Sequence, residues 1–158
     1  MRKEIKFILS SIIGVVIGYG ISGRKKDKEI CKVQQYSKKH LELFLLMNQW
    51  VKIKQEGKNL SSYFEKNNYK KIAVYGMSYV GETLIQELQN SNINVVYGID
   101  KRADSMYTDI DIVSCNQELR EVDAIIVTAI TFFDEIEDEL SRKVECPIIS
   151  LQDILYEI

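Results

Sequence analysis

The stretch Lys70–Arg102, KKIAVYGMSYVGETLIQELQNSNINVVYGIDKR, decides the fold of this chain. An apolar run at 72–75 stops at Gly76, and the apolar residues that follow have the spacing of a helix. A second run, 93–99, is rich in β-branched and aromatic residues and ends at Asp100, 24 positions after Gly76. Strand, glycine turn, helix, strand and acid in this order are typical of a dinucleotide-binding unit.

The glycine turn departs from the dinucleotide-binding fingerprint at one position. Gly76 and Gly81 occupy the places of the first and third glycines, but Ser78 stands where the second glycine lets a diphosphate approach the backbone. Backbone N–H groups of the turn precede a helix whose dipole favours a phosphate, and the Ser78 hydroxyl offers a further donor. The residues expected to bind the phosphate are Gly76, Met77, Ser78, Tyr79 and Gly81.

Other polar residues follow the predicted strands beside this turn. In sheets of this kind ligands bind beyond the carboxyl ends of the strands, where the strand order reverses. We expect Asp100 to accept hydrogen bonds from the hydroxyls of a ribose, and Lys101 or Arg102 to meet an additional phosphate. The opposite wall is expected from residues after the fourth strand, namely Thr128, Ala129 and Thr131.

The same residues also have a purely structural interpretation. Gly76 and Gly81 would then serve only the turn from strand to helix, and Asp100 would be a solvated strand end. The pattern is more specific for the fold than for a ligand, because a fold does not by itself determine function.

The remainder of the chain continues the alternation of strands and helices. Strands are predicted at 110–113, 123–129 and 146–151, an amphipathic helix at 131–143, and a closing helical turn at 152–158. The inner side of the amphipathic helix is predicted to carry Phe132, Phe133, Ile136 and Leu140. Alternating elements favour an α/β fold, here a Rossmann-like parallel sheet of about five strands in the order 3-2-1-4-5.

The N-terminal residues 7–21, FILSSIIGVVIGYGI, carry no charge, and the neutral stretch extends through Gly23. This length is just enough for one transmembrane helix, which needs about 20 apolar residues. The heavier basic cluster follows the span, so the positive-inside rule places the rest of the chain of this single-pass protein in the cytoplasm. The alternative is a signal peptide that is removed.

Small residues recur every fourth position within this expected span, at Ser10, Gly14, Gly18 and Ser22. They line one helix face and would let another backbone approach closely, which indicates a homo-oligomer. The competing interpretation is that glycine and serine are simply common in membrane helices.

A second helix is predicted over 29–56, with a broad apolar stripe and Gly57 as its stop. A helix this apolar must dock on the following domain, on a partner copy or on the membrane surface. His40 lies on the stripe, where a packed or hydrogen-bonded histidine is more common than a ligand or a base. A short helix at 60–67, capped by Asn59, completes a helical collar at 29–68.

We therefore expect three parts: an anchor at 1–28, the collar at 29–68 and a Rossmann-like domain at 69–158. The formal net charge of −2 gives no bulk attraction to nucleic acid, which argues against a nucleic-acid binder. Three scattered cysteines and a single histidine argue against a zinc site and against a disulfide framework. The acidic residues of 134–139 alternate with apolar ones and indicate a solvated face.

Residues Tyr69–Ile158 resemble the small Rossmann-like nucleotide-sugar-binding domains of bacterial surface-polysaccharide and glycosylation enzymes. Such domains begin the acetyltransferases that modify UDP-linked amino sugars and follow the membrane helices of membrane-bound nucleotide-sugar dehydratases. The stretches that carry the resemblance are KKIAVYGMSYVGETL, VVYGIDKR, VDAIIVTAITFFDEIEDEL and CPIISLQDIL. The resemblance implies a nucleotide, a nucleotide sugar or NAD at Gly76–Gly81 and Asp100, and it carries no catalytic centre over to these residues.

The sequence thus favours a membrane-tethered module that binds a nucleotide or nucleotide sugar and is accessory to surface-glycan biosynthesis. Known hydrolase, P-loop and zinc-protease motifs are missing from these residues, so the prediction leans away from an enzyme. Two alternatives stay open: a non-catalytic scaffold with a degenerate Rossmann fold, and an enzyme completed by a partner chain, such as another glycan-biosynthesis protein.

Overall fold

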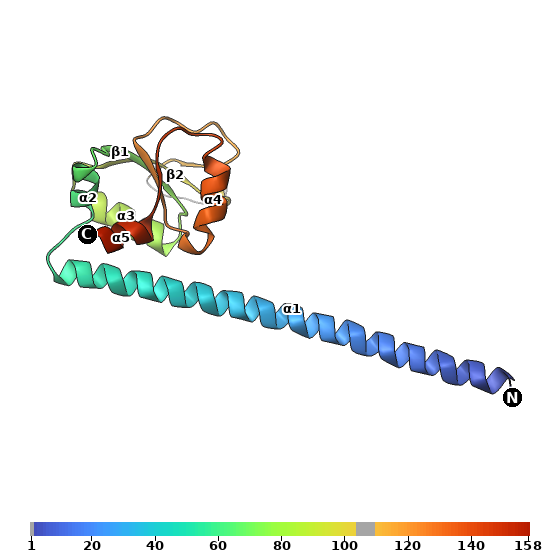
Figure 1. The fold of residues 1–158 in the computed structure, drawn as a ribbon. Coiled ribbons are helices and arrows are strands. Elements are labelled where there is room, and N and C mark those ends of the chain that lie inside the picture. Colours follow the sequence, from blue (N-terminus) through green and yellow to red (C-terminus); the bar gives the residue numbers. More distant parts are fainter. Residues whose placement is uncertain (1, 104–109) are drawn as a thin grey trace. The chain divides into compact units, whose positions relative to one another are not determined.

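The computed structural model describes the backbone of residues 2–103 and 110–158, and the side chains of 28–103 and 110–158. The chain divides into two compact units, residues 1–41 and 42–158. A single helix, α1 (Arg2–Gln55), contributes to both units, so the anchor and collar helices predicted separately belong to one element (Figure 1). The second unit begins within the predicted collar.

Within residues 28–103 and 110–158, whose side chains are described, no helix is both long enough and apolar enough to cross a membrane. The span predicted at 7–23 lies in the part of α1 whose side chains are not described, and so does the face of small residues. Both therefore remain expectations from the sequence.

The second unit is built on a parallel sheet, and the predicted strand order is confirmed as β3-β2-β1-β4-β5 (Figure 1). The strands are β1 (Lys71–Tyr75), β2 (Asn94–Ile99), β3 (Ile112–Val113), β4 (Ala124–Val127) and β5 (Ile148–Ser150). Tyr75 is in register with Ile99 of β2 and Val127 of β4, so these three strands end at one level of the sheet. The residues that follow them share one edge.

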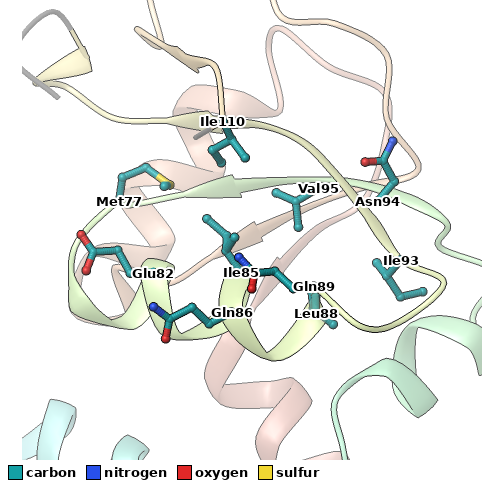
Figure 2. Close-up of a pocket in the computed structure, with 10 residues that line it drawn as sticks. All are labelled: Met77, Glu82, Ile85, Gln86, Leu88, Gln89, Ile93, Asn94, Val95 and Ile110. Atoms are coloured by element: carbon teal, nitrogen blue, oxygen red, sulfur yellow. The ribbon is translucent and has the colours of Figure 1, made fainter. Parts of the chain in front are cut away.

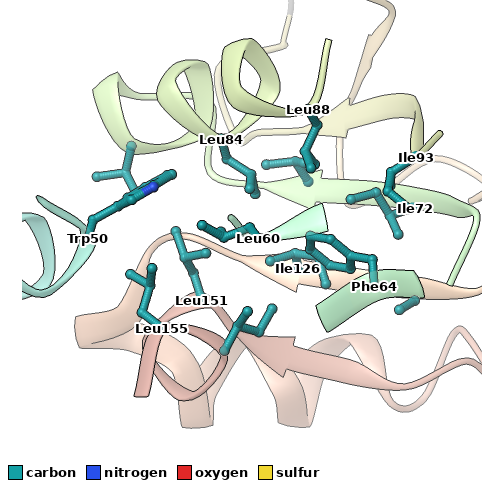
Figure 3. Close-up of a cluster of buried hydrophobic side chains, with 14 of the residues drawn as sticks. Trp50, Leu60, Phe64, Ile72, Leu84, Leu88, Ile93, Ile126, Leu151 and Leu155 are labelled. Carbon is teal, nitrogen blue, oxygen red and sulfur yellow. The ribbon is translucent and has the colours of Figure 1, made fainter. Parts of the chain in front are cut away.

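Helices cover both faces of the sheet. They are α2 (Ser61–Lys66), α3 (Tyr79–Leu88), the 3-10 turn η2 (Ile130–Phe132), α4 (Phe133–Leu140) and α5 (Leu151–Glu157). One apolar core joins the end of α1 to α2, α3 and α5 over alternate residues of β1 and β4. The other core lies under α4. Figure 3 shows the first core, in which Trp50, Leu84, Phe64 and Leu151 come from four different helices.

The end of α1 docks on the α/β fold, which answers the docking question for this part of the helix. Leu46, Trp50 and Ile53 are buried in the first core. The Trp50 indole N–H donates to Glu87 Oε2 at 2.6 Å, and Glu87 Oε1 accepts from the Leu60 backbone N–H and from Lys54 Nζ, each at 3.0 Å. One carboxylate therefore joins α1, the entry to α2, and α3.

The predicted stop and cap of the helical segment are confirmed. α1 ends at Gln55, and Gly57 follows with a φ of +74°, a left-handed conformation that glycine adopts without strain. Asn59 Oδ1 accepts a hydrogen bond from the Ser62 N–H at 3.1 Å and so satisfies a donor at the start of α2.

Two details of the prediction around α4 were wrong. Phe132, placed on the inner side of the helix, is 45% exposed, because residues 130–132 form a 3-10 turn and α4 begins only at Phe133. The strand predicted over 123–129 ends at Val127, since Ala129 has left the extended conformation with a ψ of 59°. Ile136 and Leu140 are buried as predicted.

Candidate functional site

The turn after β1 requires a glycine at position 76 for two reasons. Gly76 has a φ of +96°, which strains any residue with a side chain. A Cβ atom at this position would also lie 2.7 Å from Thr128 Oγ1, closer than van der Waals contact allows. The Gly76 N–H donates to the Ile99 carbonyl at 2.9 Å, which ties the turn to the end of β2.

Gly81 lets α3 approach this turn. A Cβ atom at Gly81 would collide with the carbonyl oxygen of Gly76, so the first turn of the helix lies directly against the backbone of the glycine turn. The close approach that the sequence pattern assigns to this glycine is therefore present here.

Met77 contributes its backbone to the site and its side chain to the core. The side chain is buried, and a Cβ atom at Gly98 of β2 would lie 2.7 Å from Met77 Sδ. Gly98 thus makes room for the thioether. A ligand at this edge would meet the main chain of Met77 and not its side chain.

Asp100 connects the end of β2 to the glycine turn. Its Oδ2 accepts a hydrogen bond from the Met77 N–H at 3.0 Å, and its Oδ1 accepts from the Arg102 N–H at 2.9 Å. The Arg102 Nε lies 3.8 Å from Oδ1, and the Asp100 side chain is 13% exposed. Each carboxylate oxygen can accept a second hydrogen bond, so the group retains capacity for a ligand.

The Thr128 side chain binds the backbone of the glycine turn. The side chain is buried, and its hydroxyl lies 2.6 Å from the Gly76 carbonyl oxygen and 3.0 Å from that of Tyr75. The hydroxyl is thus directed at the backbone of the turn. Thr131, also predicted for this wall, is half-buried in η2.

The exposed residues at this edge are polar, basic or aromatic. Ser78 precedes α3 in an extended conformation, and its side chain accepts no hydrogen bond from the first turn of that helix. Helix geometry leaves the first N–H groups without partners inside the helix, so they can bind an anion. Tyr79 is 83% exposed, and Lys101 and Arg102 are exposed on the neighbouring loop.

Tyr75, the last residue of β1, is a polar group that the sequence analysis did not single out. Its hydroxyl is buried and has no hydrogen-bond partner among the described residues. Burial, followed by the smaller effects of Cys115, Glu139 and Asp100, raises the pKa of Tyr75 to about 12. The phenol therefore remains protonated at neutral pH. A tyrosine at the end of an apolar run carries no signal by which its orphan hydroxyl could be found.

A neighbouring cluster holds a thiol in its protonated form. Burial raises the pKa of Cys115, and a hydrogen bond to Glu139 raises it as well. The pKa of Glu139 is lowered by its hydrogen bond to Lys143, whose Nζ lies 3.1 Å from Glu139 Oε1. A raised pKa makes Cys115 a poor nucleophile, so this cluster gives no support to a catalytic thiol.

A cleft of about 460 Å³ runs along α3 beside β2 (Figure 2). In Figure 2, Met77 and Glu82 lie at one end of the cleft, and Ile93 and Asn94 at the other. Of the residues predicted to bind a ligand, Met77 alone lines it. Ser78 and Asp100 are not among the residues that line this cleft.

No curated protein and no solved structure matches the chain. The model of the family described as C2185-like, N-terminal matches residues 68–147, about half of the chain. This range begins just before β1 and ends just before β5, and it includes the glycine turn and Asp100. The chain belongs to the C2185-like, N-terminal family.

Proposed function

We propose that the chain is a membrane-tethered module that binds a nucleotide or a nucleotide sugar at residues 76–81 and Asp100. It would serve as an accessory protein in the biosynthesis of surface polysaccharides or other glycans. The glycan context comes from the resemblance of Tyr69–Ile158 to nucleotide-sugar-binding domains.

The hydrogen bond from the Met77 N–H to Asp100 Oδ2, at 3.0 Å, is the observation that carries this proposal. It holds a carboxylate next to the N-terminus of α3. A nucleotide needs this pair of groups, because its ribose hydroxyls donate to a carboxylate while its phosphate is attracted to helix N–H groups. The exposed cations Lys101 and Arg102 add positive charge at the same edge.

The membrane part of the proposal is supported by the neutral stretch at 7–23 and its basic flanks. The span would anchor the chain in a bacterial inner membrane, with residues 42–158 in the cytoplasm. Protease treatment of sealed inverted vesicles and of intact spheroplasts tests this orientation. Cleavage of the α/β domain only in inverted vesicles is expected, and cleavage only in spheroplasts would contradict it.

The ligand is tested by calorimetric titration of the full chain in detergent against NAD, UDP-sugars and CDP-linked alcohols. The full chain is needed because removal of residues before 58 would take Leu46, Trp50 and Ile53 out of the core. Heat of binding with at least one ligand is expected, and Asp100→Ala should weaken it by about 10–100-fold, the loss of one charge-assisted hydrogen bond. The matched control is Asp123→Ala, which removes an exposed carboxylate from the opposite edge of the sheet. No heat with any of the ligands would exclude the ligand part of the proposal.

A second candidate function, a docking platform without a ligand, is favoured by two hydrogen-bonding features of the turn. Both oxygens of Asp100 already accept backbone hydrogen bonds, and the Thr128 hydroxyl is directed at the turn. The acid would then serve only to shape the loop. In that case Asp100→Asn leaves function in cells intact, whereas disruption of a surface such as that at Phe44 abolishes it.

A further inference from the structure

The end of α1 has two apolar faces within the unit 42–158, and only one of them is covered. Leu46, Trp50 and Ile53 project into the core. On the other side, Phe44 is 67% exposed and Val51 is 50% exposed. Large apolar side chains that form a contiguous patch on an exposed helix face are typical of an interaction surface.

The open face follows the spacing of a coiled coil. Phe44, Met47 and Val51 are separated by three and then four residues, as are the a and d positions of a heptad. Met47, between the two exposed residues, is half-buried and also packs against the first core. The same phase continues towards the N-terminus in the sequence, through Ile30, Val33, Ser37 and His40. In the unit 1–41, Ile30 and Val33 are exposed as well. About three heptads are thus available, which is the length at which such a repeat becomes significant.

Charge is excluded from the positions that would face a partner helix. Between Ile30 and Val51, every a, d, e and g position is free of Asp, Glu, Lys and Arg. The charged residues of this segment occupy b, c and f positions, namely Lys32, Lys38, Lys39 and Glu42. A neutral surface offers no complement to a charged partner, but it can meet an identical surface without like-charge repulsion.

A groove beside Val51 provides space for side chains of such a partner. It has a volume of about 380 Å³ and lies between the end of α1 and α3. Its lining includes the apolar side chains of Met47, Trp50 and Val51, together with Thr83 of α3. Gln55 and the ion pair between Lys54 and Glu87 complete the lining. An a or d side chain of a second helix could enter a hollow of this kind as a knob enters a hole.

We propose that the α1 face centred on Phe44, Met47 and Val51 pairs with the same face of a second copy of this chain, in parallel and in register. The pairing itself goes beyond the proposed function and needs no nucleotide. Its parallel direction rests on the proposed tether, because two copies anchored in one membrane by their N-terminal spans run the same way.

Disulfide trapping of the full chain in membranes tests the pairing. In a Cys31→Ser background, Phe44→Cys places a thiol at an a position, and Lys52→Cys places one at a b position as the matched control. In a parallel, in-register pair the two a positions face each other, so oxidation should give at least about five times more covalent dimer from Phe44→Cys than from Lys52→Cys. Equal or lower yield from Phe44→Cys would overturn the proposal.

A second pair of variants guards against dimers held only by the N-terminal spans. Val51→Glu added to Phe44→Cys puts a charge on the same face and should reduce the trapped dimer to the level of the Lys52→Cys control. Lys52→Glu, added in the same way, should leave the yield of Phe44→Cys unchanged. An undiminished yield with Val51→Glu would contradict the proposed face even if the copies associate elsewhere. Titration with nucleotides is unaffected by either result, so the two proposals fail separately.

Discussion

Two carboxylates in the α/β unit are almost equally buried but lie at different places in the fold. The Glu87 side chain is 11% exposed and that of Asp100 is 13% exposed. Glu87 accepts from the Trp50 indole, the Leu60 backbone and Lys54, while Asp100 accepts from the backbone of Met77 and Arg102. Glu87 lies where three helical segments meet, and Asp100 lies at the edge where parallel strands end.

The difference teaches that burial and hydrogen bonding do not by themselves separate a structural acid from a binding acid. The donors to Glu87 come from distant segments, so its loss should loosen the fold. The donors to Asp100 come from the two loops that it borders, so its loss should alter the site more than the fold.

Trp50→Ala tests the helical region most severely. The substitution removes a buried aromatic ring and leaves Glu87 without its indole donor, so the free energy of unfolding should fall by about 3–5 kcal/mol. Tyr156→Ala, which removes an exposed aromatic ring from α5, should change it by no more than about 0.5 kcal/mol. Urea unfolding measures both. Similar losses for the two variants would show that α1 is not docked through Trp50.

Glu87→Gln and Asp100→Asn compare the two acids directly. In Glu87→Gln the side-chain NH₂ would face at least one of the groups that donate to Glu87, so a donor would meet a donor. We expect a loss of roughly 2–4 kcal/mol in the free energy of unfolding. Asp100→Asn should cost only about 1 kcal/mol, since one oxygen can still accept from a loop N–H. Thermal melts of the two variants under one set of conditions measure the difference. Equal destabilisation by the two substitutions would contradict the distinction between a structural role for Glu87 and a binding role for Asp100.

Gly76→Ala and Gly57→Ala separate strain in the turn from steric conflict. Both glycines have positive φ, but a Cβ atom at Gly57 meets no atom within 4 Å, whereas one at Gly76 lies 2.7 Å from Thr128 Oγ1. Gly57→Ala should lower the free energy of unfolding by about 1 kcal/mol. Gly76→Ala should cost about 1–3 kcal/mol and also reduce ligand binding. Urea unfolding and calorimetry together check this, and unimpaired binding by Gly76→Ala would speak for the docking platform.

Asp123 extends the comparison to the opposite edge of the sheet, where its Oδ2 accepts from the N–H groups of Lys70 and Lys71 at 2.7 Å each. The Lys71 hydrogen bond is the main reason why the pKa of Asp123 is lowered. Because the folded pKa lies below the unfolded value, near 3.9, this contribution is present above about pH 4 and is lost as the pH falls through the folded pKa. Asp123→Asn should therefore reduce the loss of stability between about pH 5 and pH 2. Urea midpoints across this range measure the effect, and an unchanged slope would exclude the linkage.

The sequence predicted the fold where local patterns and topology agree. Gly76, the apolar runs around it and Asp100 were enough for the strand order, since crossover rules leave few ways to arrange alternating strands and helices. Phe132 was misplaced because a 3-10 turn shifts the phase of the helix that follows, and no residue marks that turn. The continuous α1 was divided because the change from apolar to basic residues was interpreted as a boundary.

The candidate site was predictable in its backbone and less so in its contacts. Gly76 and Gly81 could be recognised from the sequence, because a residue with a side chain would clash at either position. The use of the Thr128 hydroxyl by the turn, the orphan hydroxyl of Tyr75 and the role of Glu87 depend on side chains brought together across strands and helices. Such contacts have no fixed spacing along the chain, so sequence patterns cannot show them.

Nucleotide binding at residues 76–81 can be measured directly by titrating the full chain with nucleotides and recording its amide NMR spectrum. We expect the backbone N–H signals of Met77, Ser78 and Tyr79 to shift as the ligand is added. The Trp50 indole N–H, which is bound to Glu87, should stay in place and serves as the internal reference. If saturating NAD and UDP-sugars leave the signals of residues 76–81 unmoved, the glycine turn and Asp100 are not a nucleotide site.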